Sequence, residues 1–357
     1  MAVGRQDESA RRDDQAMSRV TSQDVARDAG VSQSAVSRVF TPGASVSKKV
    51  AARVRRSAAR LGYRPNAVAR SLITGETKII GLAVAELDNL FYPRILELLS
   101  EHLQRVGYHI MMFFADVDDA ANEQLFSNLL DYQVDGLIAA SATMSGAPIE
   151  RCREGNIPIV LFNRHQGKDG PTSVTSDNFA GGRLAATLLA REHERIAHIS
   201  GWQGSSTGRE RQEGFLAGLR AADRDLVACI DGRYCQRAAR EATLNLYTDG
   251  GCHPDALFVG SDQMAFAVMD TLRGELNLRI PQDVSVIGFD DVPMAAWPPY
   301  RLTTIRQPLE QLVAATVEQL RARIKDPNLD SDHMRLPCEI QVRESARIDR
   351  ELYSEEQ

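Results

Sequence analysis

Long hydrophobic runs are absent from this chain of 357 residues. No stretch approaches the roughly 18 uninterrupted apolar residues of a membrane span, and the first 20 residues are charged, unlike a secretory signal peptide. Cysteine is scarce: the five present are scattered without C-x-x-C spacing, which excludes a disulfide or zinc framework. The sequence therefore predicts a cytoplasmic protein with reduced thiols and without a bound metal.

Motifs of the common enzyme classes are absent as well. The chain has no G-x-x-x-x-G-K-[ST], G-x-S-x-G or H-E-x-x-H motif, and no G-x-G-x-x-G follows a predicted strand. Its seven histidines are scattered without an i, i+4 pair. Asp290 and Asp291 are adjacent, but neighbouring side chains of a strand or turn point apart. We therefore expect neither an enzyme nor a cofactor.

Positive charge is concentrated in one part of the chain. Residues 18–78 hold 12 Lys and Arg against 3 Asp and Glu, whereas residues 79–357 hold 27 against 41. The net charge of −6 thus hides a basic module fused to an acidic body. A basic module is typical of nucleic-acid binders, although charge alone also fits a solvated basic surface without a partner.

The basic module has the apolar spacing of three short helices. Thr21 or Ser22 is the expected N-cap of the first helix, and Gly30 ends it. Ser32 is the expected N-cap of the second helix, and the third helix starts at Ser47. Three short helices with a glycine turn between the first two predict a helix-turn-helix unit.

The acidic body alternates short apolar runs with amphipathic helical stretches. This pattern predicts βαβ units with parallel strands, and its length favours two sheets divided near residues 175–177. The runs expected as strands are Ile79–Ala85, His109–Ala115, Gly136–Ala140, Pro158–Phe162, Arg195–Ser200, Ala256–Gly260 and Val284–Phe289.

The motifs of the whole chain resemble one family of regulators. VTSQDVARDAGVSQSAVSRVF followed by VSKKVAARVRRSAARLGYRPNAVARSL resembles the DNA-binding head of the lactose/galactose/purine repressor (LacI) family. The resemblance continues through GLAVAELDNLFYP, SDNFAGG, RERQEGF, IPQDVSVIGFDDV and LTTIRQP, and it covers residues 20 to about 345. It implies an α/β fold: an all-α helix-turn-helix head and a two-subdomain, doubly wound body of periplasmic-binding-protein type.

The pattern and the resemblance together predict the domain boundaries. We expect a disordered tail over residues 1–17, a DNA-binding domain over 18–61 and a hinge helix with its linker over 62–77. An effector-binding and dimerisation domain is expected over 78–345, and a short tail over 346–357. Within the body, the predicted N-subdomain takes residues 78–175 and 304–334, and the C-subdomain takes 176–303 and 335–345.

The second predicted helix carries the candidate DNA-reading residues. Its polar face lies opposite an apolar face, and Gln and Arg side chains suit the hydrogen-bonding edges of adenine and guanine. Small hydroxyls at helix starts suit phosphate oxygens. By resemblance, Gln33, Ser34 and Arg38 occupy base-reading positions, while Thr21, Ser32, Ser37 and Ser47 contact the DNA backbone.

The segment after the third helix resembles the family's hinge helix. Pro65 stops the preceding helix and Asn66 can cap a short new one. In the family this helix folds on DNA and presses its leucine into the minor groove, which identifies Leu72 as a wedge. The predicted DNA-contacting residues of this segment are Tyr63, Asn66, Ala69 and Leu72.

Polar residues after the predicted strands of the body suggest a carbohydrate site. A carboxylate, an Arg fork and an amide between aromatic rings suit vicinal hydroxyls, and the ends of parallel strands are where doubly wound sheets bind ligands. The residues that the resemblance assigns to the effector pocket are Phe91, Tyr92, Asn163, Arg164, Arg211, Tyr234, Ser261, Asp290 and Gln307. Ser261 departs from the family's usual asparagine, and Asp177 and Asp262 are expected to be helix N-caps.

These observations predict a transcriptional repressor in the cytoplasm, at the nucleoid. Its expected partners are a near-palindromic operator DNA, a second copy of the chain and a small carbohydrate or carbohydrate-derived effector. A neutral sugar is favoured, and a sugar acid is compatible because two arginines could bind a carboxylate. The final 12 residues contain no leucine heptad, which favours a dimer. A solute-binding protein and a sugar-modifying enzyme are the alternatives.

Overall fold

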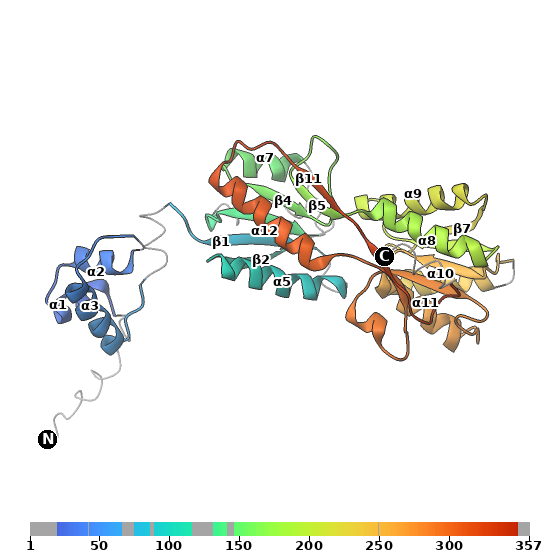
Figure 1. Ribbon diagram of the computed structural model, residues 1–357, viewed down its shortest axis with the longest axis horizontal. Coiled ribbons are helices and arrows are strands. Elements are labelled where there is room, and N and C mark those ends of the chain that lie inside the picture. The colour runs from blue at the N-terminus through green and yellow to red at the C-terminus, as the bar shows by residue number, and fades with distance from the viewer. Residues whose placement is uncertain are drawn as a thin grey trace, which may run out of the picture. The chain divides into compact units, whose positions relative to one another are not determined.

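The computed structural model describes residues 20–41, 43–65, 75–85, 89–115, 131–140, 146–248 and 250–348. The chain divides into two compact units, residues 1–77 and 78–357, which we call the head and the body (Figure 1). The predicted hinge residues Asn66, Ala69 and Leu72 lie outside the described residues. Over the described ranges, no helix is long and apolar enough to cross a membrane.

The head consists of three helices, as the sequence predicted: α1 (Ser22–Ala29), α2 (Gln33–Phe40) and α3 (Lys48–Leu61). Each helix begins at a hydroxyl residue whose side chain accepts a hydrogen bond from the first turn, and these residues are Thr21, Ser32 and Ser47. Such a bond satisfies one of the backbone N–H groups that a helix start leaves unpaired. The glycine turn is confirmed as well, because Gly30 ends α1 with a φ of 58°.

A small core holds the three helices together. Val25, Val36 and Val54 come one from each helix and are completely buried, and three buried alanines surround them: Ala26, Ala29 and Ala58. A polar tie joins α1 to α3, because Asp28 accepts hydrogen bonds from Ser57 and from the guanidinium of Arg60. The other described charged residues of the three helices are exposed or half-buried.

The body contains two sheets of parallel type. In the first sheet the strand order is β11-β5-β4-β3-β1-β2, and all pairs are parallel. Helices α5 (Phe91–Arg105) and α12 (Leu309–Lys325) pack on one face of it, and α7 (Gly146–Glu154) packs on the other. The strands are β1 (Ile79–Val84), β2 (His109–Phe114), β3 (Gly136–Ala140), β4 (Ile159–Phe162), β5 (Ser173–Ser176) and β11 (His333–Leu336).

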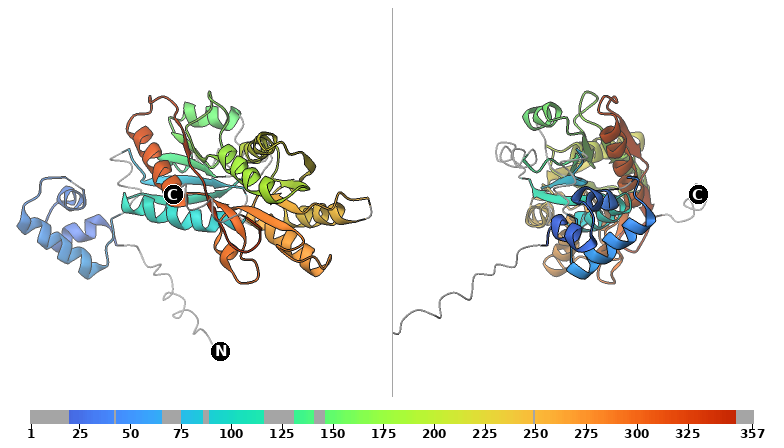
Figure 2. Two further views of the ribbon diagram at one scale, coloured as in Figure 1. Left: turned by 45° about the vertical axis from the view of Figure 1, so that its right-hand side comes forward. Right: turned by 90° about the vertical axis from the view of Figure 1, so that its left-hand side faces the viewer.

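The second sheet has the order β12-β10-β9-β8-β6-β7, and only the β10–β12 pair is antiparallel among its described strands. Helices α8 (Asn178–Glu192) and α9 (Ser206–Ala221) cover one face, and α10 (Gln236–Tyr247) and α11 (Asp262–Gly274) cover the other (Figures 1 and 2). The strands are β6 (Ile196–Ser200), β7 (Leu226–Asp231), β8 (Ala256–Val259), β9 (Ser285–Asp290), β10 (Thr303–Arg306) and β12 (Glu339–Gln341). A short 3₁₀ helix, Pro293–Ala296, follows β9.

Each sheet with its helices forms one lobe of the body. We call residues 78–176 and 309–336 the first lobe, and residues 177–306 and 339–348 the second lobe. The predicted subdomain changes after residues 303 and 334 fall inside β10 and β11. In the structure, the first of these changes lies after β10 and the second lies after β11. The reason is that β10 pairs with β9 and β11 pairs with β5, and a strand paired along its length belongs to a single sheet.

All seven predicted strands are present, within one residue at each end. The sequence prediction missed five others, namely β5, β7, β10, β11 and β12. Four of them are short, with three or four residues each, and β10 reads TTIR, for example; β7 (LVACID) is longer but alternates half-buried with exposed residues. They are strands because of the partners beside them, which a local apolar count does not detect.

Candidate functional site

In the head, α2 presents the face that the sequence predicted for DNA reading. Gln33, Ser34, Ser37 and Arg38 are all exposed, while Val36 on the opposite face is completely buried. The guanidinium of Arg38 therefore reaches solvent without costing the fold any buried contact. An exposed helix face with a fork-shaped donor is what base recognition in a major groove requires.

Three of the predicted contacts to the DNA backbone, and Tyr63 of the predicted hinge segment, also stabilise helix ends. Thr21 forms a capping box with Asp24, in which the hydroxyl accepts from the Asp24 N–H at 3.4 Å and the Asp24 carboxylate accepts from the Thr21 N–H at 3.0 Å. Ser32 and Ser47 accept from backbone N–H groups at 3.2 Å and 3.4 Å. Tyr63 is half-buried, with its ring 5.9 Å from that of Phe40. All four residues thus hold helix ends in place.

In the body, an arginine and a carboxylate form the centre of a buried polar network. Arg211, on α9, is 3% exposed and lies 3.4 Å from a carboxylate oxygen of Asp290, which is 4% exposed at the end of β9. The guanidinium also donates to Asn178 Oδ1 at 2.9 Å and to the Gly260 carbonyl at 2.6 Å, and it lies over the ring of Phe289. Burial raises the pKa of Asp290 to about 6, although Arg211 and Gln307 oppose the shift.

The network continues across the boundary between the lobes. Gln307 donates to Asp290 at 2.7 Å and accepts from the hydroxyl of Ser176 at 2.7 Å. Ser176 ends β5 of the first lobe, whereas Gln307 directly follows β10 of the second. Both residues lie where the chain passes between the lobes, so the network connects the two lobes.

At the start of α11, the N-cap is the residue before the one that the sequence suggested. The N-cap is Ser261, whose hydroxyl accepts from the Met264 N–H at 3.4 Å. Asp262 was expected to be the cap, and this was wrong: its carboxylate accepts from Thr304 Oγ1 and from the Val292 N–H at 2.5 and 2.9 Å. Complete burial, together with the nearby charge of Asp290, raises the pKa of Asp262 well above its usual range.

Asn163 and Arg164 follow β4 and are both buried. Asn163 has a φ of 58°, a conformation that asparagine tolerates well, and its side-chain oxygen has no hydrogen-bond partner among the described residues. A buried acceptor without a donor is costly unless something supplies one. The Arg164 guanidinium lies 5.8 Å from the ring of Trp202, an aromatic residue that the sequence reasoning did not include.

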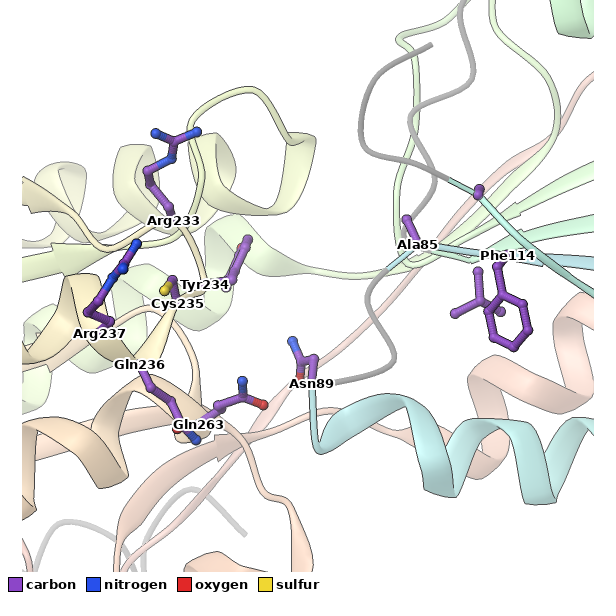
Figure 3. A pocket seen from close by; sticks show the side chains of 11 residues that line it. Ala85, Asn89, Phe114, Arg233, Tyr234, Cys235, Gln236, Arg237 and Gln263 are labelled. Carbon is purple, nitrogen blue, oxygen red and sulfur yellow. The ribbon is translucent and has the colours of Figure 1, made fainter. Parts of the chain in front are cut away.

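A cavity of about 690 Å³ lies between the lobes. Its first-lobe side is formed by the ends of β1 and β2 and by Asn89, and its second-lobe side by the segment 233–237 at the start of α10 (Figure 3). Gln263 joins the two sides, because its side-chain oxygen accepts from the Leu90 N–H at 2.9 Å. Tyr234 lines this cavity and also hydrogen-bonds Thr207 at 3.0 Å. The other lining residues are Val84, Ala85, Phe114, Ala115, Arg233, Cys235, Gln236 and Arg237.

The structure brings together only part of the predicted effector set. Arg211, Asp290 and Gln307 are hydrogen-bonded in one network, and Tyr234 lines the cavity. Phe91 and Tyr92 are each 3% exposed and pack in the core of the first lobe. Ser261 is completely buried as a cap.

Several cavity residues were missed by the sequence reasoning. Asn89 stands inside the motif GLAVAELDNLFYP, beside the residues that were chosen, so the motif itself could have indicated it. Arg233 and Arg237 carried no such signal, because they lie in a stretch without a family motif. Within the described ranges, no group of three or more His, Cys, Asp or Glu side chains is placed to hold a metal ion.

Comparison with protein families finds two matching models. Residues 21–66 match the model described as bacterial regulatory proteins, lacI family, and residues 185–346 match the periplasmic binding protein-like domain. The first range contains α1, α2 and α3, and the second contains most of the second lobe together with α12 and β11.

Individual relatives match over nearly their whole length. The HTH-type transcriptional repressor PurR of Photobacterium profundum is 31% identical over 92% of this chain and 98% of its own. Among solved structures, the lac repressor dimer bound to operator and an anti-inducer has a TM-score of 0.82 at 27% identity, over 92% of this chain and 99% of its own. The complex of the regulator CelR with cellobiose has a TM-score of 0.67 at 28% identity, over 92% and 100%.

Proposed function

Because this chain belongs to the LacI family of bacterial regulatory proteins, we propose that it represses transcription by binding a near-palindromic operator as a homodimer, under the control of a carbohydrate or carbohydrate-derived effector. One observation carries the proposal: a basic three-helix head with an exposed recognition face is joined to a two-lobed body with a cavity between its lobes. The first part suits DNA, and the second suits a small polar molecule.

The DNA contacts of the head follow from its exposed side chains. Arg38 and Gln33 read base edges with their forked and planar donors, and Ser34 assists them. Thr21, Ser32, Ser37 and Ser47 fix the register through phosphate oxygens, as do the exposed basic residues at the start of α3, Lys48 and Lys49. Tyr63, Asn66, Ala69 and Leu72 are assigned to the hinge contacts by resemblance to the family.

The effector contacts of the body involve both lobes. Asn163 contributes a buried acceptor that a ligand hydroxyl can satisfy, and Tyr234 contributes a flat ring at the cavity. Arg211, Asp290 and Gln307 form a buried polar network that reaches Ser176 of the first lobe. A ligand that touches both lobes changes their relative angle, which in a dimer moves the two heads together or apart. Ligand and operator must then affect each other's affinity by the same factor.

The alternatives from the sequence fit less well. A solute-binding protein has no use for a basic helix-turn-helix head, and members of this family are regulators rather than enzymes. Action on an operator places the protein in the cytoplasm, at the nucleoid. Dimerisation through the body follows from the two-fold symmetry of the proposed operator.

The test is selection of bound sequences from a random DNA library, followed by mobility-shift titration of the selected site. We expect a site with two related half-sites, and we expect Arg38→Ala to lose selectivity at one position of each half-site. Arg105→Ala is the matched control, because Arg105 forms an exposed ion pair with Glu101 in the body. Retention of sugar binding without any preferred DNA sequence would favour the solute-binding alternative.

A further inference from the structure

The cavity between the lobes has an unusual balance of charge. Its lining contains two arginines, Arg233 and Arg237, together with the amides Asn89, Gln236 and Gln263, and no carboxylate occurs among its described lining residues. The remaining polar groups are the hydroxyl of Tyr234 and the thiol of Cys235. The described wall of the cavity therefore carries a net positive charge.

The neighbouring polar network does not neutralise that charge. Arg211 and Asp290 are both buried and lie 3.4 Å apart, so the charge of each is already opposed by the other. Neither of them is among the described residues that line the cavity. Among the described lining residues, the charge without an opposing partner is that of the two arginines, Arg233 and Arg237.

Neither arginine forms an ion pair with another described residue, and both are exposed. The contrast is Arg240, one turn further along α10, whose guanidinium donates to both oxygens of Glu275 at 2.7 and 2.5 Å. The arginine of this helix that does not line the cavity is thus matched with a carboxylate. Arg237, on the same helix, has no such carboxylate among the described residues, so its guanidinium can bind a ligand.

The backbone conformation of the turn after β7 determines the position of Arg233. Arg233 and Tyr234 have φ angles of 52° and 55°, and the Arg233 N–H donates to Asp231 Oδ1 at 2.8 Å. Two successive left-handed residues cost free energy. The turn after β7 is therefore held in a defined shape, and it brings Arg233 and Tyr234 to the cavity together.

We propose that the effector is anionic: a carbohydrate-sized molecule with a phosphate or carboxylate group that Arg233 and Arg237 bind. Guanidinium groups bind both anions through paired hydrogen bonds. Tyr234 covers the apolar face of the ring, while Asn89 of the first lobe and Gln263, which joins the two sides, bind hydroxyls. This inference rests on the proposed function, in that it takes the cavity between the lobes as the effector site.

The experiment compares matched neutral and anionic probes by calorimetric titration. The probes are glucose, glucuronate, glucose 6-phosphate, ribose, ribose 5-phosphate and inorganic phosphate, each added to the full-length protein. We expect at least one sugar phosphate or sugar acid to bind more tightly than its neutral parent by about tenfold or more, and to weaken as salt increases. Binding of a sugar phosphate without binding of inorganic phosphate identifies the effector as a phosphorylated sugar. Preference for glucuronate over glucose identifies it as a sugar acid.

Three variants assign the effect to the cavity. Arg233→Gln and Arg237→Gln should each weaken the anionic probe and leave any neutral parent unchanged, and the double variant should remove the preference for the anion. Arg240→Gln is the matched control, since it removes the same charge from the same helix outside the cavity. Loss of the preference in Arg240→Gln as well would overturn the assignment to Arg233 and Arg237.

Failure of this inference is distinguishable from failure of the proposed function. Equal or tighter binding of the neutral sugars, or no binding of any anionic probe, overturns the anionic effector. Operator binding that responds only to neutral sugars also overturns the anionic effector, while the protein remains a regulator. Absence of any selected DNA site overturns the proposed function, while the titrations still decide the charge of the ligand.

Discussion

The head and the body place their proposed functional residues in opposite environments. On α2 of the head, the side chains proposed to meet DNA are exposed, and the core beneath them is built from separate valines and alanines. In the body, Arg211, Asp290 and Gln307 are buried and hold one another. Function and stability are therefore separable on the recognition face of the head and joined in the body.

The reason is the kind of partner each part meets. A DNA duplex is a large external surface, so the residues that contact it must project from the fold. A small molecule is enclosed, so the groups around it leave water and must satisfy each other until it arrives. Substitutions in the buried network of the body should therefore lower stability more than substitutions on the exposed face of the head.

The largest effect is expected from Arg211→Met. Removal of the guanidinium leaves Asp290 buried without its counter-charge and beside the buried carboxylate of Asp262. Such uncompensated charges cost about 3–5 kcal/mol. We expect the body to lose this free energy of unfolding in urea, followed by tryptophan fluorescence, because both tryptophans, Trp202 and Trp297, belong to the body.

Two further variants sharpen this prediction. Arg211→Met combined with Asp290→Leu removes both charges and should recover most of the lost stability. Arg240→Met breaks an exposed pair, with partners 49% and 40% exposed, and should lower the free energy of unfolding far less than Arg211→Met does. An Arg211→Met protein as stable as the Arg240→Met control would contradict the buried-network account.

The second effect is a loss of stability in acid that arises in the body. All seven histidines of the chain lie there, and burial lowers the pKa of His198 to about 4, from 6.5 for the free side chain. The unfolded chain then binds more protons than the folded one between these two values. Stability contributed by neutral His198 is complete above pH 6.5 and is lost as the pH falls toward 4, by about 3 kcal/mol.

Buried carboxylates act in the opposite direction, so the measurement must be a difference. The raised pKa values of Asp262 and Asp290 favour the folded state as the pH falls. We therefore compare wild type with His198→Phe, since His198 stacks on Phe258 with ring centroids 4.7 Å apart and an aromatic replacement fits. The stability difference should shrink or reverse from pH 7 to pH 4.5; a constant difference would show that His198 does not titrate in this range.

The sequence predicted the helix starts of the head better than the polar contacts of the body. Helix starts of the head were readable because a cap joins residues three apart, as Thr21 joins Asp24. At α11 the same rule chose Asp262, but distant partners, Thr304 and the Val292 N–H, take its carboxylate, and Gly288 leaves room for it. Nothing local to Asp262 distinguishes these outcomes.

The same limit applies to the candidate site of the body. Arg211, Asp290 and Gln307 could be named from motifs, yet their mutual bonds join residues on α9, β9 and the segment after β10. Phe91 and Tyr92 were named for their rings, and packing of the first lobe buries both. Arg233 and Arg237 become visible only when folding brings their segment opposite Asn89.

The third effect is expected in the head, where a substitution should change DNA binding and leave the stability of the fold unchanged. Arg38→Ala removes an exposed side chain from the recognition face, so the melting temperature should not move. Operator affinity should fall by about 1–3 kcal/mol, with relaxed preference at one base pair of each half-site. Binding to a library of single-base operator variants measures both. Equal weakening on every sequence would make Arg38 a phosphate contact.

The smallest effect separates two roles of one residue. Thr21→Ala removes a capping hydroxyl and should cost the head about 1 kcal/mol, measured by scanning calorimetry of the intact protein. Thr21→Asn restores a capping group and should restore that stability. Affinity measured well below the melting temperature then distinguishes the roles, because the head stays folded in all three proteins. If the Thr21 hydroxyl also binds a phosphate, Thr21→Ala weakens operator binding there despite an intact fold. If Thr21 only caps α1, affinity stays at the wild-type value. Thr21 would then contribute to the stability of the head alone, and DNA binding would depend on the exposed face of α2.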